Sequence, residues 1–282
     1  MIDYYLLPFL IIISIIFYIA VYNIKIYYSG PRIALRGKVN EQVLTGLRIV
    51  DIILPIGRGQ RELILGDRGT GKTYIVTAIL IYNSRINYLS CIDGFGAKRL
   101  FGFYIGLNQN LSKIYNLFII TSIDWRFNII FSTSSTSTSM MTFSLPLLAI
   151  TFAEYYRDRG FDLWISFDDL IKHAKSYWQL SLIIGSMPSR SSYPSSIFNI
   201  HSSFLERCGR LNASFSSGSI SGFPIIETIN SDITEFISTN VISINHWITY
   251  HHWLLHPAAN RALDYFIFDL KLLQDYPLSA AE

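Results

Sequence analysis

The chain has 282 residues and a formal net charge of +3, and apolar residues make up 50% of it while charged residues make up only 15%. That length is enough for a sizeable core in one or two domains, and the high apolar share indicates a membrane segment or wide protein contacts. The net charge is small and no basic run is interleaved with aromatics, so the composition is not that of a typical nucleic-acid-binding protein. Cys91 and Cys208 lie far apart in the sequence, so neither a disulfide framework nor a cysteine metal cluster is predicted.

An uncharged apolar segment opens the chain at residues 4–24. It is long enough to cross the ~30 Å hydrocarbon layer of a membrane as a helix. Asp3 precedes it and basic residues, beginning with Lys25, follow it, so the positive-inside rule keeps the main body on the side of synthesis. A cleaved signal peptide would need a basic region before the apolar one, which is missing here. We therefore expect a hydrophobic segment over 1–29, either a transmembrane anchor or a stretch that packs on partners.

A complete phosphate-binding pattern, G-x-x-x-x-G-K-[ST] or Walker A, follows a polar connector. It consists of Gly66, Asp67, Arg68, Gly69, Thr70, Gly71, Lys72 and Thr73. The apolar residues before it, 61–65, predict a strand, and those after it, 74–82, predict a buried helix. In such a unit, backbone N–H groups and the positive end of a helix surround a phosphate chain. Lys72 would reach the β- and γ-phosphates of ATP, or the β-phosphate of ADP, and the Thr73 hydroxyl would hold Mg²⁺.

The approach to this loop resembles one family. Residues 45–73, which include the run P-I-G-R-G-Q-R-E-L-I-L-G-D-R-G-T-G-K-T, resemble the α subunit of F-type ATP synthases at nearly every position. The Asp67-Arg68 pair is characteristic of that subunit, whereas the catalytic β subunit has small apolar residues there. Gly69 departs from the family, which usually has Gln. The resemblance therefore implies a retained phosphate loop that lacks one side-chain contact.

Residues 88–93 are predicted to form the next strand, followed by G-F-G-A-K-R over 94–99. In the α subunit that the chain resembles, the corresponding strand ends in Gly-Gln-Lys-Arg. In the catalytic paralogue, a Glu stands at the end of this strand and polarises the attacking water. Ala97 takes the nearest matching position and can neither accept a proton nor orient water. Asp93 is the nearest carboxylate, and it falls within the predicted strand. We therefore expect no catalytic residue in this chain.

Further elements follow in order: a helix over 107–118, a third strand over 128–131 and a helix over 145–156 that ends near Gly160. The serine-rich residues 132–139 have the composition of a disordered linker. The resemblance instead implies a retained loop there, which ends a strand and opens a helix.

The apolar residues 163–167 predict a buried strand, and Asp168 and Asp169 follow it directly. A carboxylate at the end of a strand beside the phosphate-loop strand is placed to hold Mg²⁺ through water, opposite Thr73. Alone, this pattern is equally consistent with a helix cap. The complete phosphate loop upstream favours the metal function, and the resemblance assigns Asp168 to Mg²⁺ and Asp169 to a structural role.

The resemblance continues through a helix over 170–184, Arg190, and strands over 218–228 and 238–244, the first of which borders the β subunit in the family. It decays beyond residue 245. The family's Ser-x-Ser-Arg, whose arginine reaches the neighbouring catalytic site, is missing after Pro257-Ala258-Ala259-Asn260. Such an arginine finger can be worth several orders of magnitude in rate. We expect either that another polypeptide supplies it or that the enzyme has changed.

A histidine-rich stretch covers residues 246–256, where His252 and His256 have the i, i+4 spacing that can bind zinc on a helix. No carboxylate or cysteine accompanies these histidines, and Trp247 and Trp253 stand among them. An aromatic tail that faces a partner is the preferred interpretation.

These observations predict an α/β fold: a RecA-like P-loop NTPase domain with a mainly parallel sheet over 30–245, between the hydrophobic segment 1–29 and a diverged tail over 246–282. The resemblance, over about 40–245, implies a shortened α-type subunit of the F1 head of the proton-translocating ATP synthase. Such a subunit binds Mg-ATP at a non-catalytic site beside the catalytic β site. The implied partners are β and other F1 subunits, with a second polypeptide for the missing C-terminal part. The implied location is the matrix face of the mitochondrial inner membrane.

Two other functions stay open. A membrane-anchored scaffold would have kept the fold and lost the nucleotide. A hexameric P-loop ATPase of the translocase or helicase type would turn ATP over, but Ala97 and the missing arginine finger argue against it. Nucleotide titration and steady-state turnover distinguish these functions.

Overall fold

The computed structural model describes residues 30–53, 55–92, 98–121, 127–185, 193–194, 196–228, 232–245 and 247–250. The hydrophobic segment 1–29, residues 251–282 of the tail, and Asp93, Ala97 and Arg190 lie outside these residues. Within the described ranges, none of the helices combines the length and the apolar character that crossing a membrane requires.

Helices and strands alternate along most of the described chain, as expected for β-α-β units. The strands are β1 (Gln42–Val43), β2 (Ile56–Gly57), β3 (Glu62–Asp67), β4 (Leu100–Gln109), β5 (Asn128–Ser134), β6 (Asp162–Asp168), β7 (Gly209–Arg210), β8 (Ser219–Thr228) and β9 (Trp247–Tyr250). The helices are the 3-10 helix η1 (Ile33–Leu35), α2 (Arg48–Ile53), α3 (Lys72–Ile92), α4 (Leu111–Thr121), α5 (Ser139–Arg157), α6 (Leu170–Ile184), α7 (Ile197–Leu205) and α8 (Phe236–Ile244).

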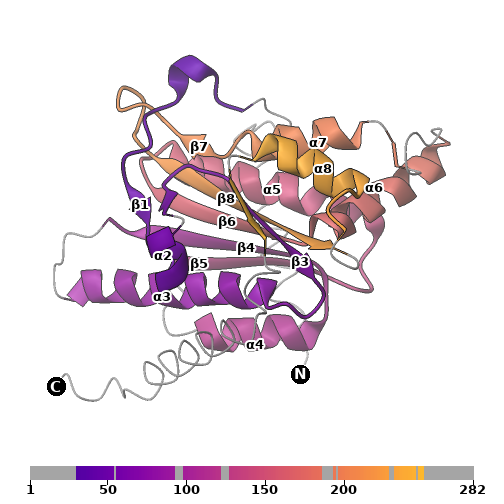
Figure 1. Ribbon diagram of the computed structural model, residues 1–282, viewed down its shortest axis with the longest axis horizontal. Coiled ribbons are helices and arrows are strands. Elements are labelled where there is room, and N and C mark those ends of the chain that lie inside the picture. Colours follow the sequence, from indigo (N-terminus) through magenta and orange to yellow (C-terminus); the bar gives the residue numbers. More distant parts are fainter. Residues whose placement is uncertain are drawn as a thin grey trace.

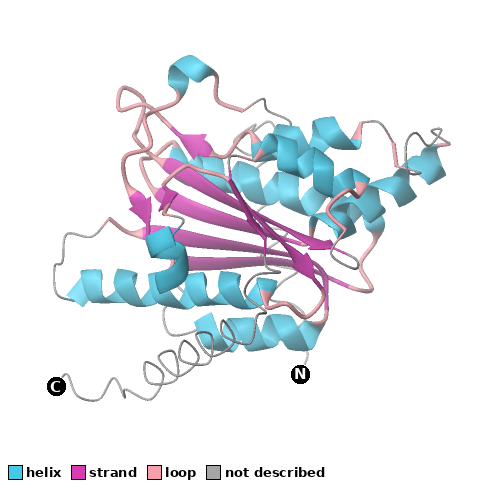
Figure 2. Ribbon diagram, in the orientation of Figure 1, coloured by secondary structure: helices cyan, strands magenta, loops and turns pink. Residues whose placement is uncertain are grey.

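One mixed sheet forms the middle layer. Its strands lie in the order β5-β4-β6-β8-β3-β9, all neighbours being parallel, and β7 joins β8 in antiparallel orientation. Helices α5 to α8 cover one face and helices α3 and α4 cover the other (Figures 1 and 2). The expected α/β fold with a mainly parallel sheet is confirmed.

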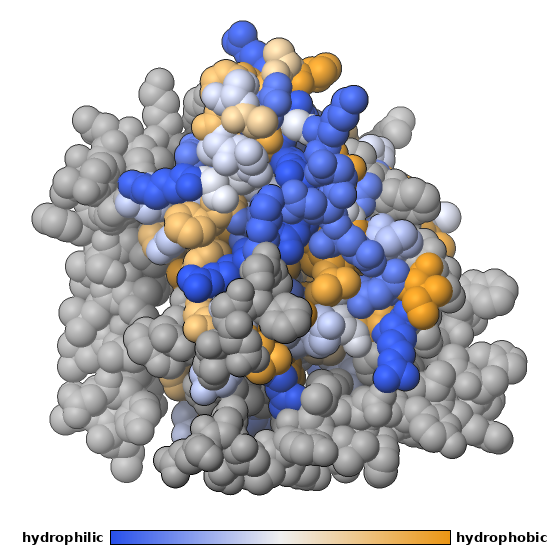
Figure 3. Space-filling view, turned by 90° about the vertical axis from the view of Figure 1, so that its left-hand side faces the viewer, coloured by the Kyte–Doolittle hydropathy of each residue, from blue (hydrophilic) through white to orange (hydrophobic). Residues whose placement is uncertain are grey.

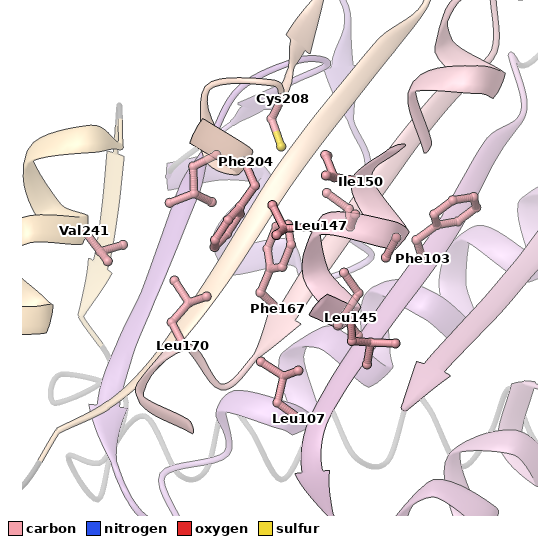
Figure 4. Close-up of a cluster of buried hydrophobic side chains, with 14 of the residues drawn as sticks. Phe103, Leu107, Leu145, Leu147, Ile150, Phe167, Leu170, Phe204, Cys208 and Val241 are labelled. Atoms are coloured by element: carbon pink, nitrogen blue, oxygen red, sulfur yellow. The ribbon is translucent and has the colours of Figure 1, made fainter. Parts of the chain in front are cut away.

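The core is split between the two faces because neighbouring strand residues point to opposite sides. Leu63 and Leu65 of β3 belong to the cluster under α5, α6 and α7, whereas Ile64 belongs to the cluster under α3. Figure 4 shows part of the first cluster, where Phe204 of α7 packs on Phe167 of β6 with ring centroids 5.1 Å apart. Burial on both faces explains why these strands are continuous apolar runs in the sequence.

Ion pairs tie the connector before the phosphate loop to the sheet. Glu41 contacts Lys98 at 2.8 Å and Arg210 at 2.9 Å, and Arg58 contacts Asp162 at 2.6 Å. The hydrogen bond from Lys98 is the main cause that lowers the pKa of Glu41 to about 2. Seen from the side where the central strands begin, hydrophilic side chains gather in the middle of the described surface (Figure 3). This side is opposite to the side where β3 ends and the phosphate loop lies.

Residues 88–92 are the last part of helix α3. The strand predicted over 88–93 is therefore wrong for the part of it that the structure describes. Buried positions such as Val76, Leu80, Asn83 and Asn87 repeat with helical spacing along α3. Asn87 also exchanges two side-chain hydrogen bonds with the backbone of Leu100, at 2.7 and 3.1 Å. The helix end therefore anchors the start of β4, which is the true next strand.

The helix predicted over 107–118 is confirmed as α4 with a later start, at Leu111, because residues 107–109 end strand β4. Another predicted element is wrong. The strand predicted over 238–244 is helix α8, and the strand that follows is β9. Ile237, Ser238 and Val241 are buried on one side of α8, a helical spacing that the short apolar run had concealed.

The other predicted elements are confirmed with changed ends. The helix predicted over 145–156 begins earlier, at Ser139, and the helix over 170–184 is α6. The serine-rich stretch is the retained loop that the resemblance implies: β5 ends at Ser134 and a turn leads into α5. The Ser137 hydroxyl closes this turn by accepting a 3.0 Å hydrogen bond from the Ser134 amide.

Candidate functional site

The phosphate-loop residues join the end of β3 to the start of α3, which is the predicted strand, loop and helix. Gly69 and Gly71 have φ angles of 83° and 84°, a left-handed backbone that glycine adopts without strain. The Thr70 hydroxyl donates a 2.8 Å hydrogen bond to the Asp67 carbonyl and holds the turn together. The N-terminus of α3 therefore opens onto this loop, as an anion site requires.

The two residues characteristic of the loop have different surroundings. The Asp67 carboxylate accepts a hydrogen bond from the Thr228 hydroxyl at the end of β8. Arg68 is exposed. The carboxylate of Asp67 therefore joins the loop to the neighbouring strand, a contact that the sequence did not predict.

Lys72 lies inside the curve of the loop. Its ammonium donates to the Gly66 carbonyl at 2.7 Å and to the Asp67 carbonyl. Burial lowers the pKa of Lys72, and the carboxylates around the loop oppose this shift. A buried ammonium that interacts with backbone carbonyls is a strong hydrogen-bond donor toward phosphate oxygens.

Thr73 and Asp168 come together from different elements. The Thr73 hydroxyl donates a 3.1 Å hydrogen bond to Oδ2 of Asp168, across the gap between the first turn of α3 and the end of β6. Tyr104 of β4 donates a 2.6 Å hydrogen bond to the same carboxylate oxygen. Burial and the neighbouring Asp168 raise the pKa of Tyr104 well above its ordinary value, so its hydroxyl stays a donor. The carboxylate is therefore fixed in orientation beside Thr73.

Asp169 has a structural contact. It is the N-cap of α6, and its carboxylate accepts a 3.0 Å hydrogen bond from the Ile171 amide. Burial raises its pKa to about 7. This contact agrees with the structural role that the resemblance implied for Asp169.

Gln109 stands at the end of β4, the strand next to β6. Ala97, which the resemblance placed at a strand end, lies outside the described residues, and residues 88–92 before it belong to helix α3. The Gln109 amide donates a 3.3 Å hydrogen bond to the Asp168 carbonyl. Its neutral side chain cannot act as a general base.

Lys113 of α4, like Tyr104, is a residue of the site that sequence reasoning missed. Its ammonium lies 3.1 Å from Oε1 of Gln109, 3.2 Å from the Thr73 hydroxyl and 3.5 Å from Oδ2 of Asp168. The spacing of four residues between Gln109 and Lys113 could have indicated this contact, but only if the end of β4 had been known.

The described residues contain no group of three or more His, Cys, Asp or Glu side chains that could hold a metal. A metal ion here would therefore depend on phosphate oxygens and water besides Thr73 and Asp168, which is how Mg²⁺ is held in nucleotide sites. The arrangement is suited to binding a phosphate chain with a hard cation. It offers no carboxylate at the end of β4 to activate water.

Comparison with known proteins identifies similar chains. Residues 46–259 match the family model described as "ATP synthase alpha/beta family, nucleotide-binding domain". ATP synthase subunit alpha, mitochondrial, of Dictyostelium citrinum is 40% identical over 219 residues, 77% of this chain and 40% of that protein. ATP synthase subunit alpha of Carsonella ruddii (strain PV) is 39% identical over 228 residues, 76% of this chain and 44% of that protein. The chain thus spans less than half the length of these curated relatives, and the family match continues past residue 245.

Proposed function

This chain belongs to the ATP synthase alpha/beta family, and we propose that it is an alpha-type subunit of an F1 head, which binds Mg-ATP or Mg-ADP at a non-catalytic site. The observation that carries the proposal is the 3.1 Å contact between the Thr73 hydroxyl and the Asp168 carboxylate, next to the loop that holds Lys72. A hydroxyl and a carboxylate beside a phosphate loop are the protein groups that a Mg-nucleotide site uses.

The nucleotide would be held mainly by the loop over residues 66–73. Its backbone N–H groups and the N-terminus of α3 would bind the phosphates, and Lys72 would donate to the β- and γ-phosphates. Thr73 would contact Mg²⁺ directly and Asp168 would do so through water. When bound, Mg²⁺ neutralises the charge of the phosphates. The ammonium of Lys113 beside Thr73 and Asp168 supports the fit, because a cation already lies among these oxygens.

The site is proposed to be non-catalytic because of Gln109. A hydrolase needs a carboxylate at this strand end to polarise the attacking water, and the carboxamide of Gln109 cannot accept the proton. Gln109 is almost fully buried, and both ends of its amide are engaged, with the Asp168 carbonyl and with Lys113. This replaces the argument from Ala97 and leads to the same expectation.

Partners and location follow from the family. An alpha-type role implies a hetero-oligomer with β and other F1 subunits, in the service of ATP synthesis coupled to proton transport. A second polypeptide for the arginine finger and a membrane contact through residues 1–29 are part of the proposal. One similar alpha subunit is mitochondrial and the other bacterial, so the matrix face of the mitochondrial inner membrane also remains a proposal.

The test is an equilibrium titration of Mg-ATP with the full-length chain, purified in mild detergent. Lys72→Ala is expected to weaken binding by on the order of 2 kcal/mol, because a charge-assisted contact to phosphate is lost. Lys175→Ala is the matched control, since it removes the same charge from an exposed position on α6. Equal affinities of the wild type and Lys72→Ala would overturn the assignment of the loop.

The same preparation separates the alternatives. A scaffold without nucleotide would show no affinity for Mg-ATP in the wild type. A hexameric ATPase would turn ATP over in the steady state without a β subunit, which Gln109 argues against.

A further inference from the structure

Lys113 places a positive charge among oxygens that the proposed function assigns to a metal site. Its ammonium lies within 3.5 Å of the Thr73 hydroxyl, the Gln109 amide oxygen and Oδ2 of Asp168. The side chain of Lys113 is 40% exposed, whereas that of Asp168 is only 7% exposed. The ammonium therefore reaches from the surface of α4 to a carboxylate that is nearly buried.

The loop lysine does not take this position. The Lys72 ammonium is bound to the carbonyls of Gly66 and Asp67. The ion pair of Asp168 is formed instead with Lys113, at 3.5 Å. Lys72 thus contacts the backbone of the phosphate loop, whereas Lys113 contacts the residues proposed to bind the metal.

An ammonium and a divalent cation cannot share these oxygens. A metal bound to Thr73 directly and to Asp168 through water would lie where the Lys113 ammonium makes its 3.2 Å and 3.5 Å contacts with these two residues. Two cations a few ångströms apart at a partly buried site also repel each other strongly. The arrival of a metal ion therefore requires the departure of the Lys113 ammonium.

We propose that Lys113 is a tethered competitor of the divalent cation: its ammonium occupies the place between Thr73 and Asp168, and Mg²⁺ binds only as the ammonium leaves. This inference rests on the proposed function, since it concerns the metal of the nucleotide bound at this loop. The partly exposed side chain lets the ammonium withdraw into solvent without moving a packed residue. The consequence is that nucleotide binding depends less on Mg²⁺ than it would with a neutral residue at position 113.

The test measures metal affinity directly. Mn²⁺, a paramagnetic probe, is titrated into the full-length chain with saturating ADP, and free Mn²⁺ is read by electron paramagnetic resonance. Lys113→Met is expected to bind Mn²⁺ about two- to fivefold more tightly than the wild type, because a competing, partly exposed ion pair is gone. Lys113→Arg keeps the charge and is expected to stay near the wild type. Lys175→Met, the same change at an exposed position of α6, is the matched control.

Salt supplies a second readout, because added salt screens the charge of Lys113 and should narrow the difference between wild type and Lys113→Met. Equal or weaker Mn²⁺ binding by Lys113→Met, or equal tightening in Lys175→Met, would overturn the inference while leaving nucleotide binding intact. ADP affinity is measured in parallel with a fluorescent analogue. If no variant bound ADP, the proposed function would fail, and this inference with it.

Discussion

The hydroxyl of Thr73 and Oδ2 of Asp168 are 3.1 Å apart, although the two residues come from the first turn of α3 and the end of β6. Strands β3 and β6 are not neighbours, since β8 lies between them. The contact therefore depends on the order of the strands as well as on the phosphate loop. It is the part of the site where a change of a single atom is most informative.

Replacing Thr73 by Val removes this hydroxyl and keeps the shape of the side chain. We expect Thr73→Val to reduce the gain in ATP affinity that Mg²⁺ brings, on the order of tenfold, because the proposed metal ligand is lost. Thr77→Val is the matched control: the Thr77 hydroxyl donates a 2.7 Å hydrogen bond to the Thr73 carbonyl within α3. ATP titrations with Mg²⁺ and with chelator measure the effect. An equal loss in both variants would speak against a metal role for Thr73.

The buried ion pair between Glu154 of α5 and Arg207 should stabilise the folded chain. Arg207 is 1% exposed and contacts the carboxylate of Glu154, while also donating a 2.8 Å hydrogen bond to the Thr151 hydroxyl. Glu154→Gln removes the negative charge from this buried ion pair, which is expected to cost about 3–5 kcal/mol in the free energy of unfolding.

The matched control for that change is Asp158→Asn on the same part of the chain. Asp158 contacts Arg157 at 2.9 Å, but its side chain is 60% exposed, so the loss should stay below about 1 kcal/mol. Urea denaturation of both variants measures the difference. Similar costs for the two substitutions would show that burial does not set the strength of the Glu154 pair.

Two buried histidines should make stability depend on pH. His173 Nε2 lies 3.1 Å from the Phe143 carbonyl, so it must donate, and Nδ1 then accepts from His201 Nε2 at 3.1 Å. Burial lowers the pKa of His173 from 6.5 to about 4 and lowers the pKa of His201 well below 6.5. Both rings are therefore neutral in the folded chain at pH values where the unfolded chain binds protons.

The free energy of unfolding should consequently fall as the pH decreases from 6.5 toward 4, by on the order of 3 kcal/mol for His173 alone at the end of this window. Urea denaturation between pH 7 and pH 5 checks the direction. The double variant His173→Gln, His201→Gln lacks these titrating groups and should show a shallower dependence over the same range. Equal slopes for wild type and double variant would contradict the prediction.

Gly218, which precedes β8, should not tolerate a side chain. A Cβ atom there would lie 2.0 Å from the backbone carbonyl oxygen of Arg157, so the backbone must move. Gly218→Ala is expected to cost about 3 kcal/mol in the free energy of unfolding. Gly209→Ala, on the neighbouring strand β7, is the control, because its Cβ would meet only a Pro31 carbon at 3.9 Å. Thermal unfolding should separate the two variants, and similar midpoints would count against the packing argument.

The phosphate loop and the strand that ends in Asp168 could be predicted because a short, contiguous sequence pattern specifies each of them. Glycines at fixed spacing, Lys72 and Thr73 specify the loop, and a continuous apolar run followed by two aspartates specifies β6. These elements also lie where the predictions placed them, as β3, α3 and β6. The family followed from the same residues.

The region between the loop and β5 could not be predicted in the same way. Residues 88–92 are mostly apolar but end helix α3, and residues 107–109 end strand β4. A strand buried on both faces has no alternation that separates it from a buried helix. The assignment of Ala97 depended on that choice, and Ala97 itself lies outside the described residues. Gln109, at the end of β4, replaces Ala97 in the argument for a non-catalytic site.

By itself, the sequence determined the family, the phosphate loop and the carboxylate at the end of β6, because local spacing is sufficient for each of them. Only the tertiary structure decided that Gln109 ends the strand beside Asp168, and that Lys113 brings its ammonium to Thr73 and Asp168. The physical reason is that parallel pairing of β4 with β6 sets which residues meet at the carboxyl edge of the sheet. The pairing depends on packing between segments that are distant in the sequence, so a local pattern does not contain it.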